Sequence, residues 1–178
     1  AMADMAGLDV GYKVREERRK AGKVEKRDSR WIDQIVEMGR HGQKTGAGIY
    51  RYQDGRTPLP DPEIQALIAR CAREAGVTQR AIGDQEILER CLYPMVNEGA
   101  KILEEGIAAR PLDIDIIWIN GYGFPAYRGG PMFWADQIGL KNIVAAYRRY
   151  AEQFGAHYWT PAPLLEKLAG EGNGFYDL

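Results

Sequence analysis

A six-residue pattern, Ala-Asp-x-x-Gly-Leu, occurs twice in this chain of 178 residues, first at residues 3–8 and again at residues 135–140. Self-similarity of this kind indicates a duplicated structural unit. Because the first occurrence lies so close to Ala1, the repeat predicts that the chain opens near the end of one copy and contains a second copy in full. We therefore expect residues 1–30 to form the tail of a truncated first helical copy plus a basic linker. Residues 31–60 are expected to form a connector, and 61–178 the complete second helical copy.

Apolar spacing and helix-start signals predict a mainly α-helical fold. Asp61, Pro62 and Glu63 combine an N-cap acceptor, a proline suited to the first turn and an acid near the positive end of the helix dipole. Asp84 and Thr160 are expected to cap later helices. The predicted helices cover residues 31–39, 61–74, 84–106 with Pro94 inside, 111–118, 132–154 with a break at Gly139, and 160–168. A small β element near residues 48–53 completes the predicted helical bundle.

The segment from Tyr12 to Arg30 carries nine Lys or Arg residues against four Asp or Glu residues and has little apolar periodicity. A solvated linker or a frayed helix is the favoured interpretation. A phosphate-binding patch is the alternative that this charge leaves open.

Composition argues against several classes of function. The net charge is −1 and the isoelectric point is about 6.2, so the chain lacks the basic surplus of nucleic-acid-binding domains. Uninterrupted apolar runs, such as residues 116–119, are far shorter than the roughly 20 residues of a membrane span. No export signal opens the chain. Cys71 and Cys91 have no metal-binding spacing, which predicts reduced thiols and no zinc site.

Motifs that would carry catalysis are incomplete. Residues 39–45 resemble a phosphate-binding loop, but Gln43 separates the second glycine from the lysine. Residues 121–123 lack the third glycine of a dinucleotide fingerprint and follow a helical pattern. His41 and His157, the only histidines, have no partner at a ligand spacing. We therefore expect no catalytic, cofactor-binding or metal-binding residues in this chain.

Three stretches nevertheless form a recognisable combination. Residues 86–99 read Glu-Ile-Leu-Glu-Arg-Cys-Leu-Tyr-Pro-Met-Val-Asn-Glu-Gly and are followed by Gly106. Residues 121–136 begin Gly-Tyr-Gly-Phe-Pro and continue through Gly-Gly-Pro-Met-Phe-Trp-Ala-Asp, and residues 42–50 hold Gly-Gln-Lys-Thr-Gly-x-Gly-x-Tyr. Together they resemble the C-terminal domain of 3-hydroxyacyl-CoA dehydrogenases, as found at the end of the multifunctional β-oxidation enzymes.

The resemblance implies a parent enzyme with an enoyl-CoA hydratase part, an NAD-binding Rossmann domain and two tandem helical copies. That parent would oxidise (3S)-3-hydroxyacyl-CoA to 3-oxoacyl-CoA with NAD bound outside this chain. The catalytic His–Glu pair of the family belongs to the Rossmann domain. The family's assisting Asn has its counterpart here at Glu89, and an ionised carboxylate cannot donate the amide's hydrogen bond. The second copy is thus expected to be catalytically silent.

A silent copy is expected to work by packing, in place of the partner subunit of single-copy relatives. Its partners would be the first helical copy and the Rossmann domain of its own chain, with a thiolase subunit as a further candidate. Trp118 is assigned to the core. The candidate interface residues are Tyr122, Phe124, Phe133 and Trp134. The turn Gly129-Gly130-Pro131 is a weaker candidate for approaching CoA, since turn glycines need no ligand.

Two questions stay open at this level. A second hypothesis makes the chain an independent acyl-CoA-binding helical module that uses Lys13 to Arg30 for phosphates. As for location, the last residues, 174–178, carry no Ser-Lys-Leu-type peroxisomal address. A bacterial cytoplasm is therefore the expected location, a mitochondrion the alternative and a peroxisome the least favoured.

Overall fold

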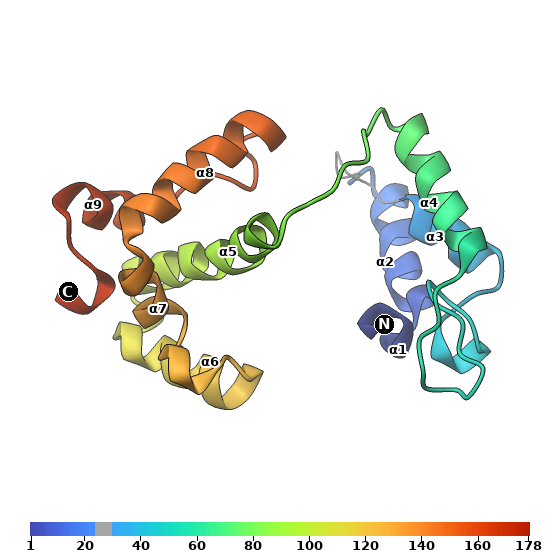
Figure 1. Ribbon diagram of the computed structural model, residues 1–178, viewed down its shortest axis with the longest axis horizontal. Coiled ribbons are helices and arrows are strands. Elements are labelled where there is room, and N and C mark those ends of the chain that lie inside the picture. Colours follow the sequence, from blue (N-terminus) through green and yellow to red (C-terminus); the bar gives the residue numbers. More distant parts are fainter. Residues whose placement is uncertain (24–29) are drawn as a thin grey trace. The chain divides into compact units, whose positions relative to one another are not determined.

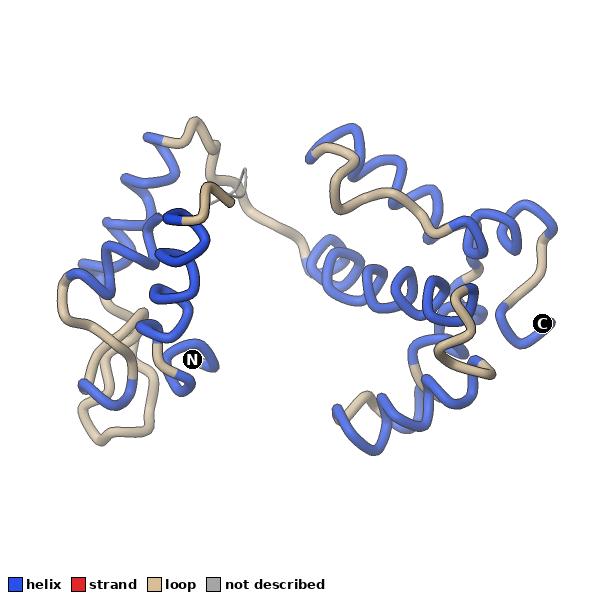
Figure 2. Tube along the Cα trace, turned by 180° about the vertical axis from the view of Figure 1, so that it is seen from behind, coloured by secondary structure: helices blue, strands red, loops and turns tan. Residues whose placement is uncertain are grey.

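The computed structural model describes residues 1–23 and 30–178, which divide into two compact units, Ala1–Ala81 and Ile82–Leu178 (Figure 1). Each unit is built from helices joined by turns, and no strand is drawn in the described part of the chain (Figure 2). The expected β element near residues 48–53 is present only as isolated bridges that pair Ala47 with Arg51 and Arg51 with Leu59. The predicted mainly α-helical class is confirmed.

Unit 1 contains four α-helices and one 3₁₀ turn within its described residues. Their bounds are α1 Met2–Ala6, α2 Leu8–Lys20, α3 Arg30–Glu37, η1 Gln43–Thr45 and α4 Pro62–Glu74. Helix α3 packs against both α2 and α4. The small core consists of Leu8, Ile35, Val36, Ile64 and Leu67.

The basic segment is helical at its start, where a linker or a frayed helix was expected. Helix α2 reaches Lys20, and residues 24–29 of the expected linker lie outside the described residues. Arg15 Nε donates a 2.8 Å hydrogen bond to Asp33 of α3, and Arg19 also donates to that carboxylate. The helix is therefore fixed by a charged contact with α3, which a search for apolar periodicity does not detect.

Unit 2 is a helical bundle in which α8 and α6 are drawn on opposite sides of α5 (Figure 1). The bounds are α5 Asp84–Glu104, α6 Pro111–Tyr122, η2 Ala126–Arg128, α7 Pro131–Ile138, α8 Leu140–Phe154, α9 Pro163–Glu171 and η3 Phe175–Asp177. Helix α7 packs against α5, α6 and α8, so it lies at the centre of the unit. The largest fully buried side chains here are Tyr147, Phe175, Met132, Ile143, Leu165 and Val96.

Most predicted helix boundaries hold within a few residues, and the exceptions have physical causes. Asp61 caps α4 as predicted, accepting the Glu63 amide at 3.1 Å. Gly83, rather than Asp84, occupies the N-cap of α5. Thr160 does not cap α9; its hydroxyl donates to the carbonyl of Ala156.

The cap of α9 comes instead from a different helix. Ala162 is the N-cap residue of α9, and its amide donates a 2.7 Å hydrogen bond to the Asn97 side chain of α5. The same Asn97 side chain donates to the carbonyl of Thr160 at 3.2 Å. A buried amide thus holds the start of α9 against α5, since Asn97 is only 5% exposed.

Candidate functional site

Two aspartates, Asp136 and Asp115, form the polar centre of unit 2, and no joint role was predicted for them. Asp136 of α7 accepts the backbone amides of Phe175 at 2.8 Å and Tyr176 at 3.0 Å, which fastens η3 to the bundle. A Cβ added to Gly174 would lie 2.6 Å from the carboxyl carbon of Asp136. Only glycine therefore allows the chain to approach this carboxylate so closely. We call this arrangement the Asp136 clasp.

Asp115 of α6 forms the second half of this centre. Its carboxylate accepts the amides of Met132 at 2.7 Å and Phe133 at 3.0 Å, both in the first turn of α7. The Tyr176 hydroxyl donates a third hydrogen bond at 2.8 Å. Amides at the start of a helix have no partner within it, so Asp115 satisfies two of them and joins α6 to α7 and η3.

Burial dominates the electrostatics of both carboxyl groups. Burial raises the pKa of Asp115 above its usual range, and the hydrogen bonds from Met132, Tyr176 and Phe133 offset only part of that rise. Burial likewise raises the pKa of Asp136, and the neighbouring negative charges of Asp177 and Asp115 add to the effect. The pKa of Tyr176 is raised by burial and by its hydrogen bond to Asp115. Every oxygen of the two carboxylates thus accepts at least one structural hydrogen bond.

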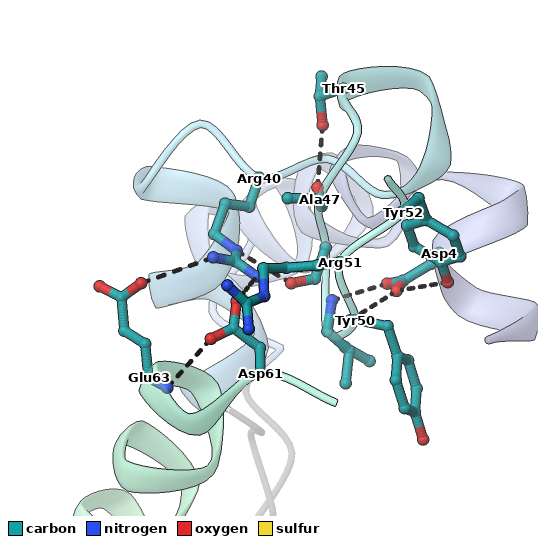
Figure 3. A network of polar contacts seen from close by, with 11 residues as sticks. Asp4, Arg40, Thr45, Ala47, Tyr50, Arg51, Tyr52, Asp61 and Glu63 are labelled. Carbon is teal, nitrogen blue, oxygen red and sulfur yellow. Dashed lines mark hydrogen bonds and ion pairs between the residues drawn. The ribbon is translucent and has the colours of Figure 1, made fainter. Parts of the chain in front are cut away.

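Unit 1 contains the same arrangement at the first occurrence of the sequence repeat (Figure 3). Asp4 of α1 accepts the amides of Ile49 and Tyr50, each at 2.9 Å, and the Tyr52 hydroxyl at 2.9 Å. Burial, followed by this hydrogen bond to Asp4, raises the pKa of Tyr52 to about 12. A Cβ on Gly48 would overlap the Asp4 carboxylate, as one on Gly174 would overlap Asp136. We call this the Asp4 clasp.

A second polar network in unit 1 joins the loop after α3 to α4 (Figure 3). Arg40 donates to the carbonyl of Gly48 at 3.0 Å and to Asp61 at 2.6 Å. Burial raises the pKa of Asp61, but its bonds with Arg40 and Glu63 lower it more, so the net shift is downward. Nearby, Lys44 pairs with Asp9 at 2.6 Å. The loop of residues 39–45 is therefore held by internal partners, and the phosphate-loop interpretation finds no support in its geometry.

Glu89, which is predicted to be the counterpart of the family's Asn, lies near the start of α5 and contacts α8. It accepts hydrogen bonds from Tyr150 at 2.6 Å, from Arg149 at 2.5 Å and from Gln85 at 3.0 Å. Burial raises the pKa of Glu89, but these donors outweigh burial and the net shift is downward. The residue acts here as an ionised link between two helices.

The predicted interface residues take two kinds of position. Tyr122 is 71% exposed and packs against Trp118 with ring centroids 4.8 Å apart and ring planes tilted by 42°, while Phe133 is 41% exposed. Phe124 and Trp134 are partly buried and contact each other edge to face at 6.4 Å. Beside them, the outer face of α6 exposes three further large apolar side chains: Leu112, Ile116 and Ile117. The interface assignment stays a prediction, with an apolar surface available for it.

The turn of residues 129–131 needs no ligand to explain its glycines. A Cβ on Gly129 would overlap the ring of Phe133, and one on Gly130 would overlap Asp115. Both glycines have positive φ angles, 78° and 98°, and Pro131 begins α7. The turn is thus shaped by its approach to Asp115, and its proximity to CoA stays an untested prediction.

A solvent-open hollow of about 630 Å³ lies beside the Asp136 clasp. Its walls include Phe133 and Leu140 and four polar side chains: Lys141, Asn142, Asn173 and Asp177. Across residues 1–23 and 30–178, no cluster of three or more His, Cys, Asp or Glu side chains could hold a metal ion. Over the same residues, no helix is both long and apolar enough to span a membrane.

The segment of residues 121–123 does not fit the pyrophosphate of the NAD that the resemblance implies for the parent. Gly123 is left-handed and ends α6, and its amide bonds back to the carbonyl of Trp118. The segment of residues 121–123 therefore lies at the carbonyl end of a helix. A pyrophosphate is held by the opposite end, where the amides and the positive end of the dipole lie.

Sequence reasoning noticed the aspartates of the repeat but missed what they bind. A signal was available, because Gly-x-Gly-x-Tyr occurs at residues 46–50 and again at 172–176. The two patterns form one contact: the aspartate of the first accepts amides of the second in each unit.

Comparison with known proteins agrees with a two-part organisation. The family model described as 3-hydroxyacyl-CoA dehydrogenase, C-terminal domain, matches residues 1–52 and 87–175. The chain is 42% identical over 186 residues to the peroxisomal bifunctional enzyme of Danio rerio, and 40% identical to that of Homo sapiens. Each alignment covers 97% of this chain and 26% of the relative, so the chain spans about a quarter of their length.

Solved structures give the same result. The dehydrogenase part of multifunctional enzyme 1 from C. elegans superposes with a TM-score of 0.65 at 30% identity, covering 93% of this chain and 37% of that one. The 3-hydroxybutyryl-CoA dehydrogenase from Escherichia coli has a TM-score of 0.62 at 19% identity, which shows a shared fold; the match covers 96% of this chain and 50% of that one.

The relatives correct one expectation. A bacterial cytoplasmic location was favoured, but the relatives from fish, human and rice are all named as peroxisomal, so that expectation is wrong. The error came from reasoning on the last five residues, because a chain that spans a quarter of its relatives need not carry their targeting signals. The family model covers well over half of this chain in two segments. The chain belongs to the 3-hydroxyacyl-CoA dehydrogenase C-terminal domain family.

Proposed function

We propose that this chain is the C-terminal helical part of an NAD-dependent 3-hydroxyacyl-CoA dehydrogenase of fatty-acid β-oxidation, in a parent that also carries an enoyl-CoA hydratase part. The parent oxidises (3S)-3-hydroxyacyl-CoA to 3-oxoacyl-CoA, and this chain supports the catalytic domain by packing against it. The observation that carries the proposal is the double match to the C-terminal domain family, in residues 1–52 and 87–175. Each matched segment contains the aspartate and the first bonded amide of one clasp.

A supporting role agrees with how the polar residues are used. Asp115 accepts three internal donors, Glu89 is bonded to Tyr150 and Arg149, and Asp4 accepts three more donors. Groups committed in this way hold helices together. The hydride acceptor of the proposed reaction, NAD, would bind the Rossmann domain of the parent.

The outer face of α6 is the surface we assign to packing within the parent. Ile116 and Ile117 are 48% and 58% exposed, in a helix that is apolar on most sides. A helix that is apolar all round is usually buried, so this face is suited to contact with the first helical copy or the Rossmann domain. The relatives described above name no thiolase, and we do not include one.

The acyl-CoA-binding module is the less favoured function. It depends on the basic segment from Lys13 to Arg30, where Arg15 and Arg19 already pair with the buried Asp33. Lys20 pairs with Glu17 at 2.9 Å. These partners compete with a phosphate for the charges that such a module would need.

The first test is NADH formation from 3-hydroxybutyryl-CoA and NAD, comparing this chain with the protein made from its full reading frame. We expect activity only in the full-length protein, with loss of turnover or stability when residues 82–178 are deleted. A full-length protein indifferent to the deletion would contradict the supporting role. Calorimetry of the 178-residue chain with an acyl-CoA separates the alternative, which requires binding.

A point variant tests the packing face itself. Ile117→Ser should lower the thermal stability of the full-length protein and leave that of the 178-residue chain nearly unchanged, because the side chain is exposed only in the latter. Ile107→Ser, at a residue that is 72% exposed in a turn outside α6, is the matched control. Equal effects of the two variants in the full-length protein would refute the assignment.

A further inference from the structure

The two clasps place Tyr50 and Tyr176 in equivalent positions. Each is the last residue of a Gly-x-Gly-x-Tyr pattern. The Tyr50 amide donates to Oδ2 of Asp4 at 2.9 Å, and the Tyr176 amide donates to Oδ2 of Asp136 at 3.0 Å. The backbones of the two tyrosines therefore make the same contact, and their hydroxyls can be compared directly.

The two hydroxyls differ in what they meet. The Tyr176 hydroxyl donates to Asp115. This aspartate belongs to α6 and joins that helix to α7 and η3. The Tyr50 ring points away from Asp4 (Figure 3), and its hydroxyl has no hydrogen-bond partner within residues 1–23 and 30–178. Tyr50 as a whole is partly exposed. Unit 1 thus presents a tyrosine donor where unit 2 has a completed hydrogen bond.

The helix beside each tyrosine shows the same difference. Helix α7 is covered by α5 and α6, which leaves Ala135 fully buried and packs Trp134 against the core. The equivalent residues of α1, by the Ala-Asp-x-x-Gly-Leu alignment, are Ala3 and Met2. Ala3 is exposed and Met2 is 81% exposed within unit 1.

We propose that Met2, Ala3 and the Tyr50 hydroxyl form a docking face for an apolar helix that carries an aspartate, in the way that α6 carries Asp115. The proposal rests on the proposed function in one respect: the docking helix would belong to the first helical copy of the parent. The chemistry of the occupant follows from the face. It must cover small and apolar side chains and bring one acceptor to a tyrosine hydroxyl.

An aspartate is the acceptor that the second unit uses at this place. Asp115 accepts the Tyr176 hydroxyl on one oxygen and, in addition, the first amides of α7. A carboxylate can serve all of these donors because it offers two oxygens and about four lone pairs. A neutral acceptor such as a serine hydroxyl would satisfy the tyrosine but not the amides.

The test compares Tyr50→Phe with its matched control Tyr176→Phe, in the 178-residue chain and in the full-length protein. Amide hydrogen exchange is followed in α1 and at residues 49–50, and in parallel in η3. In the 178-residue chain, Tyr176→Phe should speed amide exchange in η3 by about tenfold, since a hydrogen bond to a buried carboxylate is lost. In the same chain, Tyr50→Phe should leave the exchange rates in α1 and at residues 49–50 unchanged. In the full-length protein, Tyr50→Phe should speed exchange in α1 by about the same factor.

The identity of the acceptor is tested by a double-mutant cycle in the full-length protein. The aspartate that the proposed docking helix contributes is replaced by asparagine, and the effect of Tyr50→Phe should then shrink to less than about twofold. A Tyr50→Phe effect that is absent from the full-length protein, or unchanged in the asparagine background, would overturn the proposal. A full-length protein that makes no NADH yet responds to Tyr50→Phe would overturn the proposed function and leave the docking face standing.

Discussion

Replacing Asp115 by asparagine tests whether this carboxylate holds unit 2 together. The carboxylate accepts the Met132 amide on one oxygen, and the Phe133 amide and Tyr176 hydroxyl on the other. Asparagine has one acceptor oxygen and an NH₂ group. One of the two backbone amides must then face another donor. The tyrosine hydroxyl can rotate and accept from the new NH₂, so its bond is retained.

The expected loss is that of one amide bonded to a charged acceptor. Such bonds contribute about 1.5–3 kcal/mol, and the 0% exposure of Asp115 leaves no solvent to replace the lost acceptor. Asparagine also avoids the cost of burying a charge, a cost that the raised pKa of Asp115 indicates. Because this gain offsets part of the lost hydrogen bond, we expect the free energy of unfolding to fall by about 2 kcal/mol, within that range. For a unit of this size that corresponds to a fall in Tm of about 10 °C.

Thermal unfolding followed by tryptophan fluorescence provides the assay. Three of the four tryptophans, Trp118, Trp134 and Trp159, lie in unit 2 and report on its unfolding. Asp113→Asn is the control: it makes the same charge change on the same helix, but Asp113 forms an exposed ion pair with Arg110. Exposed pairs contribute about 0–1 kcal/mol. If the two variants lower the Tm equally, the role assigned to Asp115 is wrong.

Three further predictions concern other parts of the chain. Glu89→Gln should destabilise unit 2 by about 1 kcal/mol at pH 7. Because the folded pKa of Glu89 is lowered, this contribution is present above the ordinary pKa of 4.5 and is lost as pH falls through the lowered folded value. Urea unfolding at a series of pH values should show the difference between variant and parent shrinking below pH 4.5, and an undiminished difference contradicts the prediction. Gly139→Ala should lower the free energy of unfolding, measured in urea, by about 1–3 kcal/mol, because φ is 88° at this residue. Gly170→Ala, inside α9, is the control and should not destabilise the unit, so similar losses at both glycines would contradict the strain argument. Trypsin should cut after Arg80, in the exposed segment between the units, and leave residues 81–178 resistant on a gel; rapid loss of that fragment would show that unit 2 does not fold alone.

Helix starts were predictable because their signals are local. Asp61 caps α4 through an amide two residues away, and Pro111 begins α6 at a position where its missing amide costs nothing. Gly139 separates α7 from α8 as expected, with a φ of 88° that other residues rarely adopt. In each case the residue and its consequence lie within one turn of helix.

The features that sequence reasoning missed depend on distant partners. Helix α2 is held through Arg15 and Arg19 by Asp33, which lies on the next helix. The cap of α9 is Asn97, 65 residues before the amide that it accepts, so the nearby Thr160 was the wrong candidate. Propensity and capping rules describe neighbours along the chain, and they cannot rank partners that only the folded state brings together.

The clasps show how such distant contacts leave a trace when a unit is duplicated. Taken singly, the aspartate of Ala-Asp-x-x-Gly-Leu is a polar residue in a helix, and Gly-x-Gly-x-Tyr is a turn. Occurring twice in the same order, the two patterns indicate a contact, because a Cβ on the second glycine of either turn would overlap the aspartate of its own unit. The glycine and the carboxylate are therefore required together. The repeat thus carries the information needed to pair Asp4 with Gly48 and Asp136 with Gly174. Where equivalent residues of the two units have different surroundings in the described part of the chain, as Tyr50 and Tyr176 do, the difference marks the contact that we propose for unit 1.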